Sequence, residues 1–295
     1  MRARVTNGGV TKTRRILTTL VAALTFTIAV PAVASAAPSS GWNDWSCKPS
    51  ASHPEPVVLA HGLGGNATTN WFHHAPKLKD AGYCVYSLTY GATVLGGQSF
   101  GGLGSMRRSA VEFGAFVDRV RASTGADKVD IVGHSEGTTM PAYYLKFEGG
   151  AKKVKHFVGF GSNFKGTTLN GLSELARAVL ALPGLDLLTD GVCGACREYL
   201  APSGFLDDLA RGGVSVQGPT YTSIVSRHDR VVTPYTSGVL DEPGTTDIVV
   251  QDRCGADVSG HLSLAIDPNV TSLVLQALDP EGAPAPKCVP FFAPL

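Results

Sequence analysis

Residues 129–140 read VDIVGHSEGTTM, an apolar run followed by a serine between two glycines and then by a helical pattern. The run VDIV at 129–132 predicts a buried strand, and TTMPAYYLKF at 138–147 predicts a helix with Pro141 near its start. A strand, a sharp glycine-flanked turn and a helix together form a nucleophile elbow, in which the serine takes strained backbone and the glycines permit close packing. The stretch therefore predicts that Ser135 is a nucleophile.

The pattern G-x-S-x-G occurs a second time, as GQSFG around Ser99, so the pattern alone does not identify the nucleophile. Ser99 follows GATVLGG, which is no strand, and precedes GGLG, which is no helix. We therefore interpret Ser99 as part of a surface loop and favour Ser135.

Further short runs rich in β-branched and aromatic residues alternate with helical patterns along the chain. Such runs predict strands at 56–60, 84–88, 154–161, 221–226 and 247–251. Apolar residues at helical spacing predict a helix over 105–120 with Ser105 as its cap, and Asp267-Pro268 predicts the start of a final helix. This alternation predicts a single α/β domain with a mostly parallel central sheet and helices on both faces.

The interval 164–220 contains no clear strand and includes an amphipathic stretch with Leu172, Leu175, Val179 and Leu182. In an α/β domain we expect such an interval to be an insertion over the strand ends. It would act as a lid or as a wall that binds an acyl chain, or it would be an ordinary covering helix.

A serine hydroxyl is a weak nucleophile at neutral pH, so it needs a histidine base and a carboxylate that holds the histidine. In enzymes with a nucleophile elbow, the acid and then the histidine follow the serine in the chain. His261 lies in a glycine-flanked loop after the last predicted strand, and Asp229 follows the strand before it, so we predict these two. Asp252 is a rival acid, but it ends the strand that delivers His261. His156 lies inside a predicted strand, and the acids upstream of His228 all lie in the strandless interval.

An acyl-transfer intermediate carries an oxyanion that needs two preorganised N–H donors. One should be the backbone N–H of Glu136, directly after the serine. The other should be that of Leu63 in the sequence HGLGG, where glycines let the backbone approach. We expect His61, at the start of that turn, to hold the loop by hydrogen bonds.

The first 36 residues have the pattern of a secretory signal peptide: a basic segment, an apolar run of about 15 residues and a small-residue end at Ala36. The apolar run is shorter than the ~20 residues of a membrane span, although a retained anchor is an alternative. The chain has 25 basic and 24 acidic residues. Five of the basic residues and none of the acidic ones lie in this leader, so residues 37–295 carry a net charge of −4. No basic run remains, so we expect no nucleic-acid partner.

The six cysteines all lie after the predicted leader, at Cys47, Cys84, Cys193, Cys196, Cys254 and Cys288. An even number in an oxidising compartment predicts three disulfides, in any of fifteen pairings. The pair in Cys193-Gly-Ala-Cys196 could also form a redox or zinc pair, but no second ligand pair is evident. No D-x-D-x-D-G loop is present, so calcium is not indicated, and we expect neither a metal nor an organic cofactor.

The motifs HGLGG, GHSEGTTMPAYYLKF, GSNFKGT, SRHDRVVTP and SGHLSL, in this order, resemble the secreted actinobacterial lipases of the lipase class 2 family. The resemblance spans roughly residues 47–288, and more distantly the chain is similar to yeast lipase B. It implies an α/β-hydrolase fold, action on carboxylic esters and a triad of Ser135, Asp229 and His261. It also implies the pairings Cys47–Cys84 and Cys254–Cys288, which leave Cys193–Cys196. Glu136 departs from the pattern, because such lipases often carry Met or Gln there.

These features predict a secreted, monomeric serine hydrolase that acts on lipid or small esters, most simply a triacylglycerol lipase working at a lipid–water interface. A short-chain, wax or polyester esterase and an acyltransferase are alternatives that fold and triad do not separate. A non-catalytic binding protein is a remote alternative, because no member of the triad is missing.

Overall fold

The strands of the chain form one parallel sheet. The computed structural model describes residues 41–94, 96–169, 193–199 and 203–293. Within these ranges the strands are β1 (Val57–Ala60), β2 (Val85–Ser87), β3 (Val129–His134), β4 (Val154–Phe160), β5 (Thr220–Val225) and β6 (Thr245–Val249). Their order is β2-β1-β3-β4-β5-β6, and all neighbouring strands are parallel. The six strands predicted from the sequence are all present.

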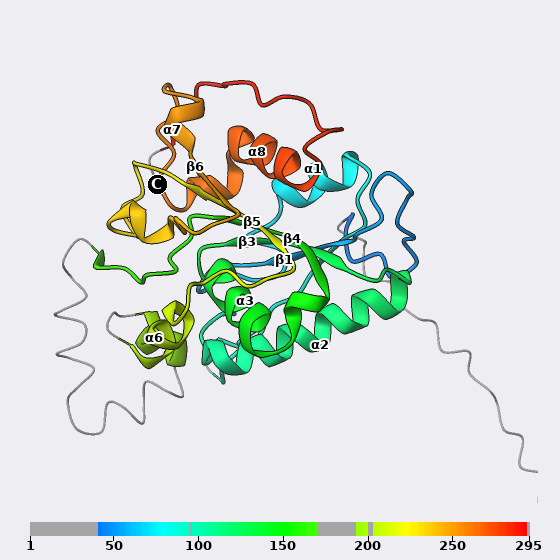
Figure 1. Ribbon diagram of the computed structural model, residues 1–295, viewed down its shortest axis with the longest axis horizontal. Helices are drawn as coiled ribbons and strands as arrows, with labels where there is room; N and C mark the ends of the chain where they lie inside the picture. Colours follow the sequence, from blue (N-terminus) through cyan, green and yellow to red (C-terminus); the bar gives the residue numbers. More distant parts are fainter. Residues whose placement is uncertain (1–40, 95, 170–192, 200–202, 294–295) are drawn as a thin grey trace, which may run out of the picture. The chain divides into compact units, whose positions relative to one another are not determined.

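Helices lie on both faces of this sheet (Figure 1). The α-helices are α1 (His74–Asp80), α2 (Met106–Thr124), α3 (Glu136–Phe147), α6 (Gly204–Ala210), α7 (Val250–Arg253) and α8 (Pro268–Leu278), and residues 193–199 are also helical. Short 3-10 helices are η1 (Gly150–Lys152), η3 (Tyr235–Gly238) and η4 (Ser263–Ile266). The predicted α/β-hydrolase fold, with a parallel sheet between two helical layers, is confirmed.

Side-chain alternation along the strands divides the core into two halves. Val58 and Ala60 of β1 pack with α2 and α3, whereas Val57 and Leu59 pack with α1 and α8 on the other face. All four side chains are fully buried. A strand that is apolar on both faces belongs in the interior of a parallel sheet, and this explains the continuous apolar runs in the sequence.

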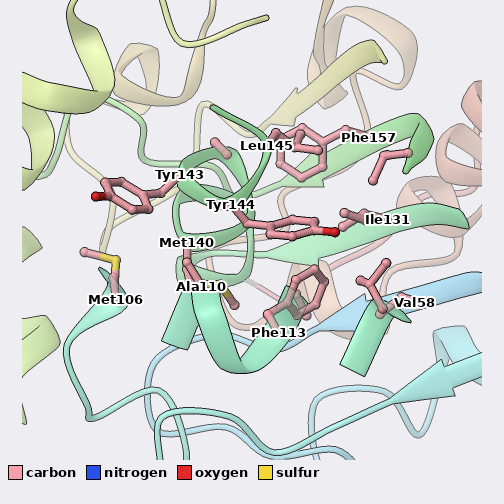
Figure 2. Packing of buried hydrophobic residues seen from close by; sticks show 14 of the residues in the cluster. Val58, Met106, Ala110, Phe113, Ile131, Met140, Tyr143, Tyr144, Leu145 and Phe157 are labelled. Carbon is pink, nitrogen blue, oxygen red and sulfur yellow. The ribbon is translucent and has the colours of Figure 1, made fainter. Parts of the chain in front are cut away.

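The packing of α3 against α2 fixes the helix that follows the glycine-flanked turn. Figure 2 shows Tyr144 of α3 above Phe113 of α2, with its hydroxyl end next to Ile131 of β3. The rings of Phe113 and Tyr144 meet edge to face at 5.6 Å between centroids. Gly114 makes room for this contact, since a Cβ there would lie 2.8 Å from the Tyr144 ring.

Four local predictions need correction or extension. The helix predicted from residue 138 begins at Glu136, two residues earlier, and Pro141 lies inside it. The helix predicted over 105–120 continues to Thr124. The strand predicted over 247–251 ends at Val249, because an apolar run of this length is compatible with a strand or a helix and α7 begins at Val250.

The fourth prediction, the cap of α2 at Ser105, is confirmed in position and needs extension. Ser105 is the N-cap residue, but its side chain makes no capping hydrogen bond. Glu198 provides the cap instead: its Oε1 accepts from the Ser105 hydroxyl at 2.8 Å and its Oε2 accepts from the Met106 N–H at 2.5 Å. A carboxylate at a helix N-terminus is favoured by the helix dipole and stabilises the helix as a local cap does.

Two predicted segments fall wholly or partly outside the described residues. These are the leader at 1–36 and the amphipathic stretch with Leu172, Leu175, Val179 and Leu182. In the described parts of 164–220, no strand occurs until β5 begins at Thr220. The described residues all belong to one compact unit, Pro38–Leu295. The boundary at residue 36 and the lid role of 164–220 stay predictions.

Candidate active site

The order of the strands places a crevice at the carboxyl ends of β1 and β3. These two strands are neighbours, but the chain leaves β1 towards β2 and leaves β3 towards β4, in opposite directions across the sheet. In open α/β sheets, ligands bind at such a switch point. The loop at 61–65 follows β1 and Ser135 follows β3, and a Cβ on Gly62 would lie 3.1 Å from the Ser135 Cβ.

Ser135 has strained backbone, with φ 54° and ψ −119°. A non-glycine residue in such a conformation costs about 1–3 kcal/mol and persists where the surroundings fix it. Here the flanking positions admit only glycine. A Cβ at position 133 would lie 1.9 Å from the Gly137 carbonyl oxygen, and a Cβ at position 137 would lie 1.8 Å from that of Ala60. The G-x-S-x-G pattern around Ser135 is therefore required by packing.

A chain of hydrogen bonds joins the three residues predicted as a triad. His261 Nε2 lies 2.8 Å from Ser135 Oγ, and His261 Nδ1 lies 2.7 Å from Asp229 Oδ2. Asp229 Oδ1 accepts from the N–H groups of Val231 and Val232, at 2.8 and 2.7 Å. All three triad side chains are buried. With Nδ1–H donating to Asp229, Nε2 is free to accept the serine proton, which is the arrangement of a nucleophile, a base and an orienting acid.

The rival residues lie elsewhere. Asp252 is on α7, where it pairs with Arg227 at 2.7 Å in an exposed ion pair. His156 pairs with Asp130, 2.9 Å between Nδ1 and Oδ1. The backbone N–H of His228 donates to Ser226 Oγ at 3.1 Å. Ser99 lies in an exposed turn.

The loop after β1 keeps one backbone N–H unused. The Gly62 N–H donates to Asn70 Oδ1 at 3.0 Å, the Gly64 N–H to the Gly101 carbonyl at 2.9 Å, and the Gly65 N–H to the Gly62 carbonyl at 2.9 Å. Within the described part of the chain, neither the Leu63 N–H nor the Glu136 N–H donates a hydrogen bond. The geometry thus leaves free the two donors that the sequence predicts for an oxyanion.

His61 holds this loop through both ring nitrogens. Its Nδ1–H donates to the Gly62 carbonyl at 2.8 Å, and its Nε2 accepts from the Tyr90 N–H at 3.3 Å. Burial lowers the pKa of His61 to about 4, so the ring is neutral at pH 7. Both nitrogens are occupied, which leaves His61 no part as a second base.

Two supporting residues were missed from the sequence. His134 Nε2 lies 3.1 Å from the His261 carbonyl oxygen, and His134 Nδ1 lies 3.1 Å from Asn70 Oδ1. Together they connect the loop after β1, the end of β3 and the His261 loop. Burial lowers the pKa of His134 well below its usual value, so His134 is neutral and has a single N–H, which it donates to the His261 carbonyl or to Asn70 Oδ1 but not to both. The position of His134 directly before the serine was the one sequence feature that could have indicated its role, and no sequence feature indicated that of Asn70.

Glu136 contributes its backbone to the site, while its side chain lies buried and without a hydrogen-bond partner at either carboxyl oxygen. These oxygens lie under Gly102, where a Cβ would approach Oε1 to 3.0 Å. Burial, with a smaller contribution from the charge of Glu198, raises the pKa of Glu136 well above its usual value. Burial therefore favours the neutral form of the Glu136 carboxyl, and this is how the chain accommodates an acid after the serine.

An apolar cavity of about 950 Å³ opens above Ser135. Its walls come from the loop after β1, the segment after Asp229, the His261 loop and the 193–199 helix. The lining residues are Gly62, Leu63, Gly64, Gly65, Thr69, Asn70, Phe72, His134, Ser135, Asn163, Thr167, Leu169, Cys196, Tyr199, Val231, Val232, His261, Leu262, Ala265 and Ile266. Leu63, Phe72 and Leu262 line the cavity and are also exposed, which gives it an apolar rim.

Disulfides join Cys47 to Cys84, Cys193 to Cys196 and Cys254 to Cys288, the same pairs that the family resemblance implies. In the described ranges, no group of three or more His, Cys, Asp or Glu side chains is arranged to hold a metal ion. The helices of the described residues include none that is long and apolar enough to cross a membrane.

Comparison with protein families matches residues 54–267, more than half of the chain, to the model of the lipase (class 2) family. The chain belongs to the lipase (class 2) family. Among curated relatives it is 34% identical over 93 residues to a triacylglycerol lipase of Pseudarthrobacter phenanthrenivorans and to one of Burkholderia plantarii. Each alignment covers 30% of this chain but only 27% and 24% of the respective relative.

Solved structures share the fold of this lipase class 2 chain at low identity. Aspergillus fumigatus lipase B has a TM-score of 0.62 at 20% identity, over 81% of this chain and 57% of that one. Mature Bacillus licheniformis lipase BlEst2 has a TM-score of 0.55 at 17% identity, over 78% of this chain and 93% of that one.

Proposed function

We propose that the protein is a serine hydrolase that cleaves carboxylic esters through an acyl-enzyme on Ser135. The observation that carries the proposal is the hydrogen-bonded chain from Ser135 through His261 to Asp229, in which Ser135 and His261 line the cavity. Membership in the lipase (class 2) family supports it independently.

In the first half of the reaction, Ser135 Oγ attacks the ester carbonyl carbon while His261 Nε2 takes the hydroxyl proton. Asp229 holds the His261 ring and stabilises the imidazolium that forms. The N–H groups of Leu63 and Glu136 donate to the oxyanion, each worth about 3 kcal/mol of transition-state stabilisation. The intermediate collapses, His261 gives its proton to the leaving alcohol, and the acyl group stays on Ser135. In the second half, water attacks the acyl-enzyme with His261 as base, and the acid is released.

We propose lipid esters, such as triacylglycerols, as the substrates. The cavity of about 950 Å³ is lined mostly by apolar groups and accommodates an extended acyl chain. The exposed apolar rim of Leu63, Phe72 and Leu262 suits the surface of a lipid aggregate. Three disulfides and the pattern of the first 36 residues support a secreted protein.

Hydrolysis of p-nitrophenyl esters from acetate to palmitate, by the wild type and by Ser135→Ala, tests the proposal. We expect the highest kcat/KM at medium or long acyl chains and a loss of at least about a thousandfold in the variant. A maximum at acetate would contradict the lipid substrate, and activity that survives in Ser135→Ala would contradict the mechanism. Partition to an added alcohol in preference to water would identify an acyltransferase.

A further inference from the structure

Behind the His261 loop lies a closed cluster of four buried polar side chains. It consists of Asp257, Ser259, Asp267 and Asn269, and the two aspartates and the serine have no exposed surface. In the described part of the chain, no cation is among the hydrogen-bond partners of either carboxyl group. Two buried carboxylates in contact with one hydroxyl, without a cation, repel each other unless one is neutral.

The number of hydrogen atoms in the cluster also indicates that one of the two carboxyl groups is neutral. Ser259 Oγ lies 2.6 Å from Asp257 Oδ1 and 2.8 Å from Asp267 Oδ2, but the hydroxyl has only one hydrogen to donate. Both contacts are hydrogen bonds only if one of the two carboxyl groups carries a proton and donates it to Ser259 Oγ.

The remaining contacts decide which aspartate holds the proton. Asp257 also accepts from the Ser259 N–H at 2.8 Å and from the Asn269 side-chain amide at 2.6 Å, so both its oxygens face donors. Asp267 Oδ1 accepts from the Asn269 N–H at 2.7 Å, whereas in the described part of the chain its Oδ2 has no N–H donor, only the Ser259 hydroxyl, and the Asp257 carboxyl lies within hydrogen-bonding reach. Donors stabilise a charged carboxylate, so the charge belongs on Asp257.

We infer that Asp267 is a protonated acid that donates to Ser259 and thereby positions His261, so that Asp267, Ser259 and Asp257 act as a proton-dependent clamp. This inference rests on the proposed function, because it assigns a positioning role to residues behind the proposed base. Burial, together with the charge of Asp257, raises the pKa of Asp267 to about 7, in agreement with the hydrogen-bond geometry.

The clamp reaches both loops of the triad. The Ser259 carbonyl, two residues before His261, accepts from the Ser226 hydroxyl at 2.6 Å. The Ser226 carbonyl in turn accepts from the Asp229 N–H at 3.2 Å. Ser226 and Ser259 therefore hold the acid loop and the histidine loop together, and the proton on Asp267 fixes the orientation of Ser259.

Other titratable groups lie on the surrounding elements. From α1, His74 contacts the Leu264 carbonyl at 3.0 Å and Thr271 Oγ1 at 2.9 Å, and burial lowers its pKa to about 3, so it stays neutral. On α7 and the loop after β5, Asp252 and Arg227 pair with each other. The triad's own Asp229 and His261 lie at the far end of the two loops. Asp257 is thus the charge that Asp267 meets.

Loss of the Asp267 proton to solvent would place a second negative charge in the cluster and remove the hydrogen bond to Ser259. The unfolded chain releases this proton near pH 4, whereas the folded chain keeps it to about pH 7. The folded state is therefore most favoured at low pH, and this part of its stability is lost as the pH rises. Between about pH 4 and 7, unfolding releases this one proton, so the unfolding equilibrium constant rises tenfold for each unit by which the pH increases.

Two isosteric variants test the position of the proton through their melting temperatures from pH 4 to 9. In Asp267→Asn the amide accepts from Asn269 and donates to Ser259, as the protonated acid does, so we expect a stable protein without this pH dependence. In Asp257→Asn the amide NH₂ faces an N–H donor in either orientation, that of the Ser259 backbone or that of the Asn269 side chain, so we expect a lower melting temperature at every pH. Equal pH dependence in wild type and Asp267→Asn, or loss of the dependence in Asp257→Asn instead, would overturn the assignment.

Activity tests the positioning role, with ester hydrolysis followed by titration of the released acid. We expect the ratio of the kcat of Asp267→Asn to the kcat of the wild type to rise as the pH increases from 6 to 9, because only the wild type loses the proton at this position. KM should be unchanged. A ratio that is constant with pH would overturn the role in positioning His261, whatever the melting data show. A wild type that hydrolyses no ester would instead refute the proposed function, while the melting temperatures still report the proton.

An infrared measurement on the clamp itself covers the case in which the variants do not fold. The C=O stretch of a protonated acid should be present at pH 5 and disappear as the pH rises through about 7. The measurement uses Glu136→Gln as the background, because Glu136 is a further buried acid near the site whose pKa is raised by burial. Absence of this band at pH 5 would overturn the inference.

Discussion

Replacement of Asp229 by asparagine tests how the acid controls the proposed base. The substitution preserves the shape of the side chain, so its effect depends on which way the amide turns. Asp229 Oδ1 accepts from two backbone N–H groups, and Oδ2 accepts from His261 Nδ1. An amide NH₂ turned towards the two N–H groups would leave both unpaired, at about 1–3 kcal/mol each.

In Asp229→Asn the new amide therefore turns its NH₂ towards His261. His261 Nδ1 must then accept, so the ring proton moves to Nε2, where it faces Ser135 and cannot take the serine proton. A wrong tautomer of this kind costs about 10⁴ in kcat, or about 5 kcal/mol. The fold should lose little stability, because both backbone N–H groups keep their acceptor.

The assay is kcat on a soluble p-nitrophenyl ester, with thermal unfolding as a check on folding. Asp252→Asn is the matched control: Asp252 is the rival acid, and it forms an exposed ion pair with Arg227, so we expect unchanged activity. A fall of less than tenfold in Asp229→Asn, or an equal fall in Asp252→Asn, would refute the assignment of the acid.

Substitutions at three further positions, one with a matched control, give sharp expectations. Gly137→Ala should abolish soluble expression or lower stability by more than about 3 kcal/mol, because its Cβ would lie 1.8 Å from the Ala60 carbonyl oxygen. Its control, Gly204→Ala on α6, has nothing within 4 Å and should leave stability unchanged or raise it by up to about 1 kcal/mol in urea unfolding. Glu136→Gln should be more stable than wild type in alkaline buffer and equally stable in acid, because the raised pKa of Glu136 makes the stability of the wild type fall as the pH rises. Melting temperatures of the two proteins that change in parallel from pH 5 to 10 would contradict this. Glu198→Ala removes the cap of α2 and should cost about 1 kcal/mol of unfolding free energy in urea, and no measurable cost would contradict the capping role.

The sheet and the elbow were predictable because their signals are local. Each strand of this sheet is a short run rich in β-branched or aromatic residues, and Ser135 has its strand, glycines and helix within a few residues in sequence. His261 and Asp229 were predictable from chain order, since each follows a strand of a known fold pattern. The exact end of β6 was not, because the apolar run continues into α7.

The groups that support the site could not be predicted, because their partners are far away in sequence. Glu198 caps a helix more than 90 residues before it, and Asn70 reaches His134 across 64 residues. The sequence predicted Leu63 as an oxyanion donor from the glycines around it. The other three N–H groups of this loop donate hydrogen bonds, and two of their acceptors belong to Asn70 and Gly101. These partners are known only from the structure.

Covalent trapping of the nucleophile tests the central claim most directly. An alkyl phosphonate ester with a long chain, incubated with the protein and followed by peptide mass spectrometry, should label one residue per molecule, Ser135. Labelling should be absent in Ser135→Ala and undiminished in Ser99→Ala, which removes the serine of the second G-x-S-x-G pattern. An adduct on any other residue, or no adduct on a folded wild type, would contradict the account.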